Sequence, residues 1–519
     1  MISFLISLVA LIIGYIVYGR VVERIFGPDD RTTPAVAMAD GVDYIVMPNW
    51  RVFMIQFLNI AGTGPIFGAI MGAWYGPVAY FWIVLGCIFA GAMHDYFSGM
   101  LSMRLGGANQ PGIVGHFLGK TTRTVLLFFT VFLLVMVGVV FVYSPALILE
   151  TMAPMGIVWW VIIIFVYYLL ATMLPIDKVI GRFYPIFAIS LLFMALGLFV
   201  VLLIKWPAIP EVWTPMAEAN LNEAVGALSP AQLLGVESYF TKNPLFPCLF
   251  LTIACGAISG FHATQSPLMA RCLKSERMGR PIFYGSMITE GIVALVWATV
   301  SMYFFYYGGW REVVAPESVE AFLAQVGGEK GKTLIQYFSA PAVVESVCSG
   351  WLGTFGGILA VLGVVAAPIT SGDTAFRSAR LIIASAFGLE QKSIPKRFLI
   401  SIPLFGVALL FLFWQMENPD GFNTIWQYFG WSNQTLAVFM LWAITVYLVQ
   451  QRKLYVISLI PALFMTAVSA TFLFVSPQGF GNFIPREVGY PLGIATLVVA
   501  LVWFYRWKHN NYAQRDVMK

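Results

Sequence analysis

The sequence predicts an all-α integral membrane protein with about 13 transmembrane helices. Of its 519 residues, 59% are hydrophobic and 11% are charged, and the mean hydropathy is +0.82. Soluble domains carry about 25% charged residues, so this chain has too little polar surface to face water on all sides. About 20 apolar residues cross a bilayer as a helix, which leaves room for about a dozen spans. The composition excludes a disordered chain, a disulfide-rich secreted scaffold and a nucleic-acid-binding protein.

Thirteen apolar runs are the candidate spans, and the lipid bilayer is their expected surrounding. The first run, residues 2–18, has no basic region before it and no small-residue cleavage site after it, which favours a retained span over a signal peptide. The other runs lie near residues 51–74, 79–103, 123–149, 155–174, 182–204, 244–274, 281–307, 351–376, 396–415, 423–449, 454–475 and 489–506.

The placement of lysine and arginine gives an independent test, because basic residues accumulate in cytoplasmic loops. With thirteen alternating spans and the N-terminus outside, 24 of the 30 basic residues and the C-terminus fall on the cytoplasmic side of the inner membrane. The basic residues that fall outside are Lys205, Lys242, Arg311, Lys330, Lys332 and Arg486. A missed span would exchange the cytoplasmic and outer basic residues from that point onward. The uneven distribution therefore supports both the number of spans and the orientation of the chain. The long outside loops near 205–243 and 308–350 each have room for a short surface helix.

The second run is interrupted by glycine and proline over residues 59–65. Glycine costs about 1 kcal/mol and proline about 3 kcal/mol inside a helix. Pro65 suits the first turn of a new helix, with Thr63 or Gly64 as its N-cap. Taken alone, the pattern fits a kinked packing helix equally well, since membrane helices tolerate both residue types.

The seventh run carries a second interruption, from Ala254 to Pro267, for which Ser266 is the expected N-cap of the reopened helix. The two interrupted runs are five spans apart, so they cross the membrane in opposite directions. Paired broken helices of this kind mark the binding site of secondary transporters built from inverted repeats. The free N–H groups and positive dipole ends at the breaks suit a carboxylate, and the free carbonyls suit a cation.

This pairing predicts a division of the chain around a 5+5 inverted-repeat core. The predicted segments are an extra helix at 1–25, a first five-helix repeat at 45–205 with its break near 59–65, an extracytoplasmic loop at 206–243, a second repeat at 244–450 with its break near 255–267, and two final helices with a cytoplasmic tail at 451–519.

Ionisable residues inside spans are functional candidates, because burying a charge in a bilayer costs several kcal/mol. His94 and Asp95 are adjacent in the third run, so they point about 100° apart and cannot face one site in the same way. Asp95 serves either cation coupling or the locking of the bundle. Glu290 is the candidate for titration during a cycle, with a permanently hydrogen-bonded glutamate as the alternative. His262 lies within the second break, which favours substrate contact or proton transfer over plain packing.

Two polar segments complete the candidates. Thr370, Ser371 and Asp373 offer oxygens to a cation, although Asp373 has Arg377 and Arg380 as alternative partners near the cytoplasmic face. Asn433 and Gln434 follow Ser432 and place side-chain amides in an apolar helix, where they must find partners.

The cysteines and histidines show no metal-binding spacing. The five cysteines have no C-x-x-C pattern, and most lie in or beside apolar runs, so we interpret them as unpaired packing residues. The four histidines share no ligand spacing either. We therefore expect neither a metal site nor a cofactor other than a coupling ion.

Four segments together resemble the carbon starvation protein A (CstA) family, in a form shorter at its C-terminal end than the longer members. They are Asp40-Gly41-Val42-Asp43-Tyr44, Ile60-Ala61-Gly62-Thr63-Gly64-Pro65, Ala254-Cys255-Gly256-Ala257-Ile258-Ser259-Gly260-Phe261-His262 and Phe429-Gly430-Trp431-Ser432-Asn433-Gln434. The resemblance runs from about residue 1 to 480. It implies an inner-membrane secondary transporter with a LeuT-like core, related to the amino acid–polyamine–organocation superfamily.

This resemblance also implies uptake of peptides or of pyruvate, with protons as the coupling ion for pyruvate. Together with the breaks, it predicts a symporter for a small carboxylate-bearing nutrient during carbon starvation. The expected substrate-binding residues are Gly62, Thr63, Gly64, Gly256, Ser259, Gly260, His262, Thr264, Gln265, Ser266, Asn433 and Gln434. The expected coupling residues are Asp95, His94 and Glu290 for a proton, and Thr370, Ser371 and Asp373 for a cation.

Three alternatives stay open at this point. A Na⁺-coupled peptide or amino-acid transporter is the first, because the Thr370–Ser371 pair resembles the sodium-binding segment of LeuT-like transporters. An intramembrane enzyme using Asp95, His94 or His262 as acid and base is the second, without any nucleophile–base spacing or phosphate loop in its favour. A nutrient sensor without transport is the third. The sequence gives no oligomeric state.

Overall fold

A computed structural model describes residues 1–41, 43–152, 155–173, 176–214, 233–314, 316–325, 333–390, 393–418 and 421–517. Within these ranges every regular element is a helix, and there is no strand. The prediction of an all-α chain is confirmed for this part of the protein. Several predicted features lie outside the described residues, namely 215–232 in the middle of the 206–243 loop, Val42, Lys330, Lys332, Lys392 and Lys519.

The helices follow one another in three groups along the chain. The first group is α1 Ile2–Ile16, α2 Tyr18–Phe26, α3 Pro34–Ala37, α4 Asn49–Ile60, α5 Gly64–Gly72, η1 Ala73–Tyr75, α6 Val78–Phe81, η2 Trp82–Gly91, α7 Ala92–Arg104, α8 Gln110–Leu118, α9 Lys120–Met152, α10 Ile157–Met173 and α11 Ile176–Lys205. The second group is α14 Val236–Lys242, α15 Leu245–Thr252, α16 His262–Ala270, η3 Glu276–Met278, η4 Arg280–Tyr284, α17 Gly285–Tyr306, α18 Trp310–Val313, α19 Pro316–Gln325 and α20 Leu334–Tyr337. The third group is α21 Ala340–Leu359, η5 Ala360–Val365, α22 Ala366–Phe387, α23 Ile394–Glu417, α24 Gly421–Gln450, α25 Val456–Val475 and α26 Arg486–Val517.

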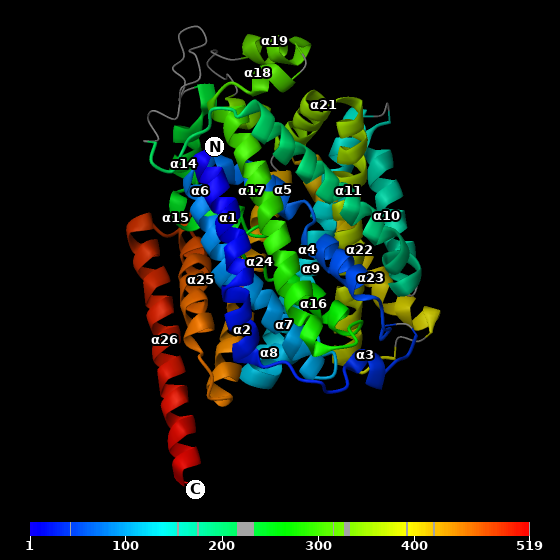
Figure 1. Ribbon diagram of the computed structural model, residues 1–519, viewed down its shortest axis with the longest axis vertical. Helices are drawn as coiled ribbons and strands as arrows, with labels where there is room; N and C mark the ends of the chain where they lie inside the picture. Colours follow the sequence, from blue (N-terminus) through cyan, green and yellow to red (C-terminus); the bar gives the residue numbers. More distant parts are fainter. Residues whose placement is uncertain are drawn as a thin grey trace.

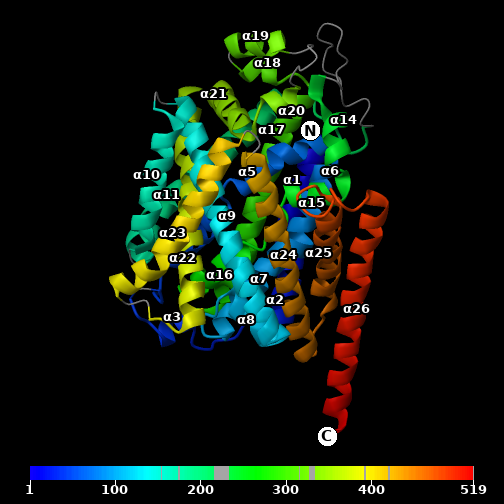
Figure 2. The same cartoon turned by 180° about the vertical axis from the view of Figure 1, so that it is seen from behind.

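The long helices lie side by side as one bundle (Figures 1 and 2). In both views the N-terminus lies near one end of the bundle and the C-terminus at the other. The helix α26 runs along the outer edge, and the short helices α18 and α19 cover the end that holds the N-terminus. These two, with α20, are surface helices within the predicted 308–350 loop.

Ten described helical segments are long and apolar enough to cross a membrane, or up to eleven if the bent pair α4 and α5 is one span. Two further predicted runs coincide with α10, which has 17 residues, and with the short helices α15 and α16. The chain is therefore a multi-span helical membrane protein, whereas the count of thirteen stays a prediction.

The outer surface of the bundle is apolar, as a lipid-facing surface must be. Large side chains on the outer helices are strongly exposed, among them Phe128 on α9 (70%), Leu410 on α23 (71%) and Trp503 on α26 (75%). Polar residues that the sequence places in the spans are instead buried inside the bundle, and so are all five cysteines, which are free.

The first interruption separates α4 from α5 by a bend of 44°. Thr63 is the N-cap residue of α5, and Pro65 lies in the first turn, where its missing N–H leaves no hydrogen bond unmade. The Thr63 carbonyl accepts from Ile66 N at 3.2 Å and Phe67 N at 2.7 Å, whereas its hydroxyl has no hydrogen-bond partner. The buried hydroxyl thus stays available at the break.

The second interruption lies between α15 and α16, and it corrects one prediction. Ser266 is wrong as the N-cap, because α16 already begins at His262 and includes both Ser266 and Pro267. The helix starts earlier because a residue from α24 replaces the missing cap: Asn433 Oδ1 accepts from Phe261 N at 2.6 Å. The hydroxyl of Ser266 instead accepts a hydrogen bond from Gln56 Nε2 on α4 at 3.1 Å.

The two interruptions touch each other at the centre of the bundle. A Cβ atom at Gly64 would lie 2.3 Å from Cys255 Sγ, so only glycine permits this approach. On one side of the contact, α4 meets α16 through Gln56 and Ser266. On the other side, the Thr252 carbonyl at the end of α15 lies 2.7 Å from the position of a Cβ at Gly68 on α5. We call these two contacts the α4–α16 seam and the α5–α15 seam.

Candidate functional site

Four titratable side chains from three helices form a continuous cluster beside the second break. His94 Nδ1 donates to Asp95 Oδ1 at 2.8 Å within α7. The other carboxylate oxygen of Asp95 accepts from His262 Nδ1 on α16, also at 2.8 Å. His262 Nε2 lies 3.5 Å from Glu290 Oε2 on α17. The fold therefore links His94, Asp95, His262 and Glu290 in one row, with Asp95 between the two imidazoles.

All four side chains are fully buried, with 0% of their surface exposed. The two oxygens of Asp95 each accept a hydrogen bond, whereas neither oxygen of Glu290 has a hydrogen-bond partner. His94 Nε2 and His262 Nε2 also lack hydrogen bonds. Buried, unsatisfied ionisable groups inside a membrane protein are costly, so their retention points to a function rather than to stability.

The second break is fixed by Asn433 on α24. Its Oδ1 accepts from Phe261 N and from Ser259 Oγ, the latter at 3.0 Å. Its own carbonyl accepts from Gly260 N at 3.1 Å. Of the predicted substrate residues, Ser259, Gly260 and Asn433 are thus brought together, directly before the helix that carries His262.

Replacing Asn433 with alanine is expected to destabilise the protein by about 1–3 kcal/mol, because the buried N–H of Phe261 and the Ser259 hydroxyl lose their acceptor. Asn433→Asp keeps an acceptor oxygen and should cost less. Thermal unfolding in detergent measures the difference. Asn482→Ala is the matched control: its Nδ2 donates to Pro477 O on an exposed loop, so its loss should cost under about 0.5 kcal/mol. Equal losses for both alanine variants would contradict the capping role.

The polar residues of α22 lie beside the first break. Ser371 Oγ donates to Leu58 O near the end of α4 at 3.1 Å. The Thr370 hydroxyl donates to Ala367 O within its own helix at 2.8 Å. Asp373 Oδ2 accepts from Tyr184 OH at 2.8 Å, and its Oδ1 has no hydrogen bond. Ser371 is therefore the α22 side chain that meets the free carbonyl end of a half-helix.

The remaining predicted substrate residues are buried, some beside the first break and the others beside the second. The Thr264 hydroxyl donates to Phe261 O at 2.6 Å, and Gln265 Nε2 donates to Thr264 Oγ1 at 2.9 Å. Gln434 Nε2 donates to Phe250 O on α15 at 2.8 Å, so it braces the other half-helix. Gly62 packs beside Ser371 Oγ at the first break, and Gly256 packs against Ala294 on α17.

Sequence reasoning missed three polar residues of this centre. Gln56 bridges the two half-helices α4 and α16, and Asn59 lies buried one turn further on with neither side-chain atom hydrogen-bonded. Tyr184 holds Asp373. The signal for Gln56 and Asn59 was present, since amide side chains in an apolar run must find partners.

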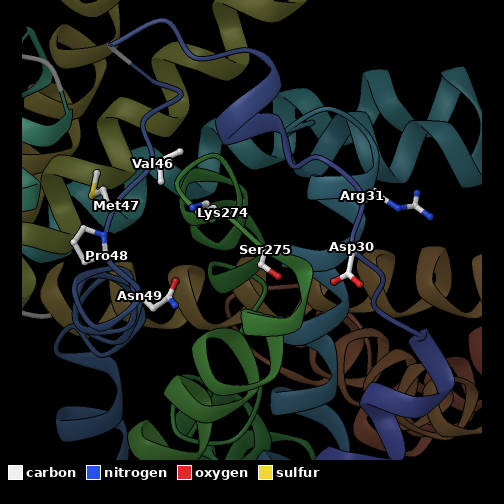
Figure 3. A pocket seen from close by; sticks show the side chains of 8 residues that line it. All are labelled: Asp30, Arg31, Val46, Met47, Pro48, Asn49, Lys274 and Ser275. Atoms are coloured by element: carbon white, nitrogen blue, oxygen red, sulfur yellow. The ribbon is translucent and has the colours of Figure 1, made fainter.

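An open cavity of about 640 Å³ lies at the end of the bundle that the α4–α16 seam faces. Figure 3 shows Lys274 and Ser275 on the segment after α16, between the residues that precede and begin α4 and the pair Asp30 and Arg31. Arg277 forms an ion pair with Asp30, Nε to Oδ1 2.7 Å, and this contact holds the pKa of the exposed Asp30 carboxyl below its ordinary value. The cavity carries both signs of charge and lies apart from the buried cluster.

Comparison with known proteins relates most of the chain to one family. The family model described as "Carbon starvation protein CstA" matches residues 1–203 and 146–472. A relative from Haemophilus influenzae, named "Uncharacterized membrane protein", is 46% identical over 59% of this chain and 91% of its own length. The "Peptide transporter CstA" of Bacillus subtilis is 26% identical over 97% of this chain and 96% of that protein. The protein of that name from Escherichia coli K12 is 24% identical over 89% and 78%.

Solved structures share the fold at low identity. A manganese transporter from Eremococcus coleocola, in complex with an aromatic bis-isothiourea substituted compound, superposes with a TM-score of 0.52 at 11% identity, covering 92% of this chain and 99% of that chain. At this identity the likeness concerns the fold alone.

Proposed function

This chain belongs to the carbon starvation protein CstA family, and from that premise we propose that it is a secondary active transporter. In this proposal it is a cation-coupled symporter, with H⁺ as the coupling ion, that takes up a small carboxylate-bearing nutrient, either pyruvate or a peptide, and it is not an enzyme. Relatives named peptide transporters and a transporter fold support transport as the activity.

The observation that carries the proposal is the buried row from His94 to Glu290 at the meeting point of two helix breaks. A coupling cation must be bound at a site that the substrate also affects. Asp95 and Glu290 provide two carboxyl groups there, and both side chains are fully buried. Rows of aspartate, glutamate and histidine inside membranes are the usual means of moving protons in pumps and transporters.

The substrate carboxylate has a matching place beside this row. The helices α5 and α16 begin at the two breaks, which touch each other, so the positive dipole ends of both helices lie in the same central region. Thr63 with its unbonded hydroxyl stands before α5, and His262 stands at the first position of α16. We propose that the carboxylate binds between these ends, with Gln265 Oε1 as an acceptor for a second polar group.

The described conformation is closed around this centre. The central side chains are fully buried, and a seam lies on each side of them, α4 against α16 and α5 against α15. Substrate therefore has to enter through a movement that opens one seam while the other stays packed. This is the alternating access expected of transporters with paired broken helices.

The architecture that we propose for the whole chain keeps the predicted division. Thirteen spans would comprise an extra helix at 1–25, five-helix repeats at 45–205 and 244–450 joined through 206–243, and two final helices at 451–519. The N-terminus would face the outside and the C-terminus the cytoplasm of an inner membrane. A single cysteine introduced at either terminus tests this orientation with a membrane-impermeant thiol reagent applied to intact cells. The reagent should label the N-terminal cysteine and not the C-terminal one, and labelling of both from outside would refute the orientation.

Uptake by purified protein in proteoliposomes tests the function. We expect labelled pyruvate to accumulate when the outside is made acidic and to stay at passive levels without a gradient. Competition by di- and tripeptides decides between the two substrate classes. Accumulation that is indifferent to both a pH and a Na⁺ gradient would overturn the coupling claim, and ligand-induced thermal stabilisation without any accumulation would favour a sensor.

One observation favours a second candidate, a Na⁺-coupled peptide or amino-acid transporter. Ser371 meets the carbonyl of Leu58 at the end of the first half-helix, and hydroxyl and carbonyl oxygens are the ligands of hard cations. Accumulation driven by a Na⁺ gradient and lost in Ser371→Ala would establish this candidate in place of H⁺ coupling.

A further inference from the structure

Three side chains that can each offer one ligand atom to a metal ion, a sulfur, a nitrogen and an oxygen, lie close together in the centre of the bundle. Cys255 Sγ in the second break, His262 Nε2 at the start of α16 and a carboxylate oxygen of Glu290 on α17 all lie within 4.8 Å of one another. All three side chains are fully or almost fully buried. We propose that Cys255, His262 and Glu290 form a binding site for a divalent transition metal of the zinc type. This proposal concerns a ligand other than the transported nutrient, and its site shares His262 and Glu290 with the proposed coupling row.

The donor set fits zinc better than the harder cations. Zinc takes thiolate at about 2.3 Å and imidazole or carboxylate at about 2.0–2.2 Å, commonly with three protein ligands and one open position. Manganese, magnesium and calcium prefer oxygen, and a thiolate with an imidazole selects against them. Ligand atoms around a tetrahedral zinc lie about 3.3–3.8 Å apart on these bond lengths, so two atoms at the 4.8 Å limit need to approach by about 1–1.5 Å.

The surroundings of His262 are those of a metal-binding imidazole. Its Nδ1 donates to Asp95 Oδ2 at 2.8 Å, which leaves Nε2 without a hydrogen bond and with a lone pair to offer, 3.5 Å from Glu290 Oε2. A carboxylate behind a ligating histidine fixes its tautomer and raises its basicity. Asp95 is itself held by His94 through its other oxygen. The imidazole is thus presented in the orientation that a metal needs.

Buried polar atoms without hydrogen bonds are the independent observation that points to ligand binding here. Both oxygens of Glu290 and Nε2 of His262 are buried without a hydrogen-bond partner. A proton shared between His262 and Glu290 would satisfy those two groups but would leave Cys255 unexplained. The thiol makes only long contacts, 3.8 Å to Ser259 Oγ and 3.9 Å to Asn433 Nδ2. A metal satisfies all three groups, and the thiol proton leaves for the solvent as it binds.

Direct metal binding to the purified full-length protein in detergent tests the site. After equilibrium dialysis against Zn²⁺, elemental analysis should find one zinc per chain that a tenfold excess of Mn²⁺ or Mg²⁺ does not displace. Cys255→Ser and Glu290→Gln should each weaken binding at least tenfold. Asp95→Asn, which touches no metal in this proposal, should weaken it about 10–100-fold through His262. Cys348→Ser is the matched control, because Cys348 is a buried free cysteine on α21, and it should bind zinc as the unaltered protein does.

Cobalt gives a second readout, because its spectrum in the unaltered protein reports thiolate ligation directly, before any variant is made. Co²⁺ bound to the unaltered protein should show a thiolate charge-transfer band, which disappears in Cys255→Ser and persists in Cys348→Ser. Absence of retained zinc, absence of the thiolate band, or equal zinc binding by Cys255→Ser and the unaltered protein would each overturn the proposal. None of these measurements involves transport, so a failure here leaves the proposed function standing, and a failure of transport leaves the metal site standing.

Discussion

Glu290→Gln is expected to abolish cation-driven accumulation of substrate, lowering the accumulation ratio roughly tenfold or more, which corresponds to about 1.4 kcal/mol. Glu290 is buried on α17 with no hydrogen bond to either oxygen, and His262 Nε2 at 3.5 Å is its polar neighbour. A carboxyl group there can bind and release a coupling proton, whereas glutamine keeps the shape of the side chain but cannot titrate. Uptake into proteoliposomes under a pH gradient measures the effect.

The same variant should still exchange substrate across the membrane at equal concentrations, because exchange requires no net movement of the coupling cation. Glu345→Gln is the matched control: this half-buried glutamate on α21 accepts from Ser349 at 3.4 Å, away from the cluster, and its replacement should leave accumulation intact. Ser371→Ala should also accumulate substrate under a pH gradient. Undiminished accumulation by Glu290→Gln would remove the buried row from the mechanism.

Gly260→Ala is expected to have the largest effect on stability. A Cβ at this position would lie 2.2 Å from the Asn433 carbonyl oxygen and 2.5 Å from Ala437 N, and both are backbone atoms that no rotamer change can move. α24 would have to shift away from the break, at a cost of about 1–3 kcal/mol for overpacking. The hydrogen bonds from Gly260 N and Phe261 N to Asn433 would be lost as well, at about 1 kcal/mol each.

Thermal unfolding in detergent and uptake measured on the same preparation test this expectation. Gly406→Ala is the control, because Gly406 lies inside α23 with open space around it, and alanine favours a helix by about 1 kcal/mol over glycine. The control should unfold at the same or a higher temperature. If Gly260→Ala unfolds at the temperature of the unaltered protein, the close contact between α24 and the second break is not required for stability.

Much of the fold follows from the sequence because each of its signals is local. A run of about 20 apolar residues, a glycine–proline interruption or a basic loop is visible within one window, and the helices lie where those runs lie. The start of α16 was misplaced because its cap comes from a distant part of the chain: Asn433 replaces the role that local rules assign to Ser266. No window that contains Ser266 also contains Asn433.

For the candidate site, the sequence predicts the individual residues but not the contacts between them. Asp95, His262 and Glu290 were identified one at a time, because each is an ionisable residue in an apolar run. That Asp95 bridges His94 and His262, and that Cys255 faces Glu290, depends on how three helices and a break rotate against each other. Sequence spacing carries no information on these rotations, which is why the cysteines and histidines showed no ligand pattern.

The two seams determine how well a membrane containing this protein keeps its ion gradient. A bilayer stores energy only while no continuous file of water connects its two faces, and a proton moves along such a file without carrying any substrate. Gln56 bonded to Ser266 closes one side of the buried row, and the Thr252 carbonyl against Gly68 closes the other. In the proposed cycle the leak therefore depends on how well these two seams stay packed, and not on substrate recognition alone.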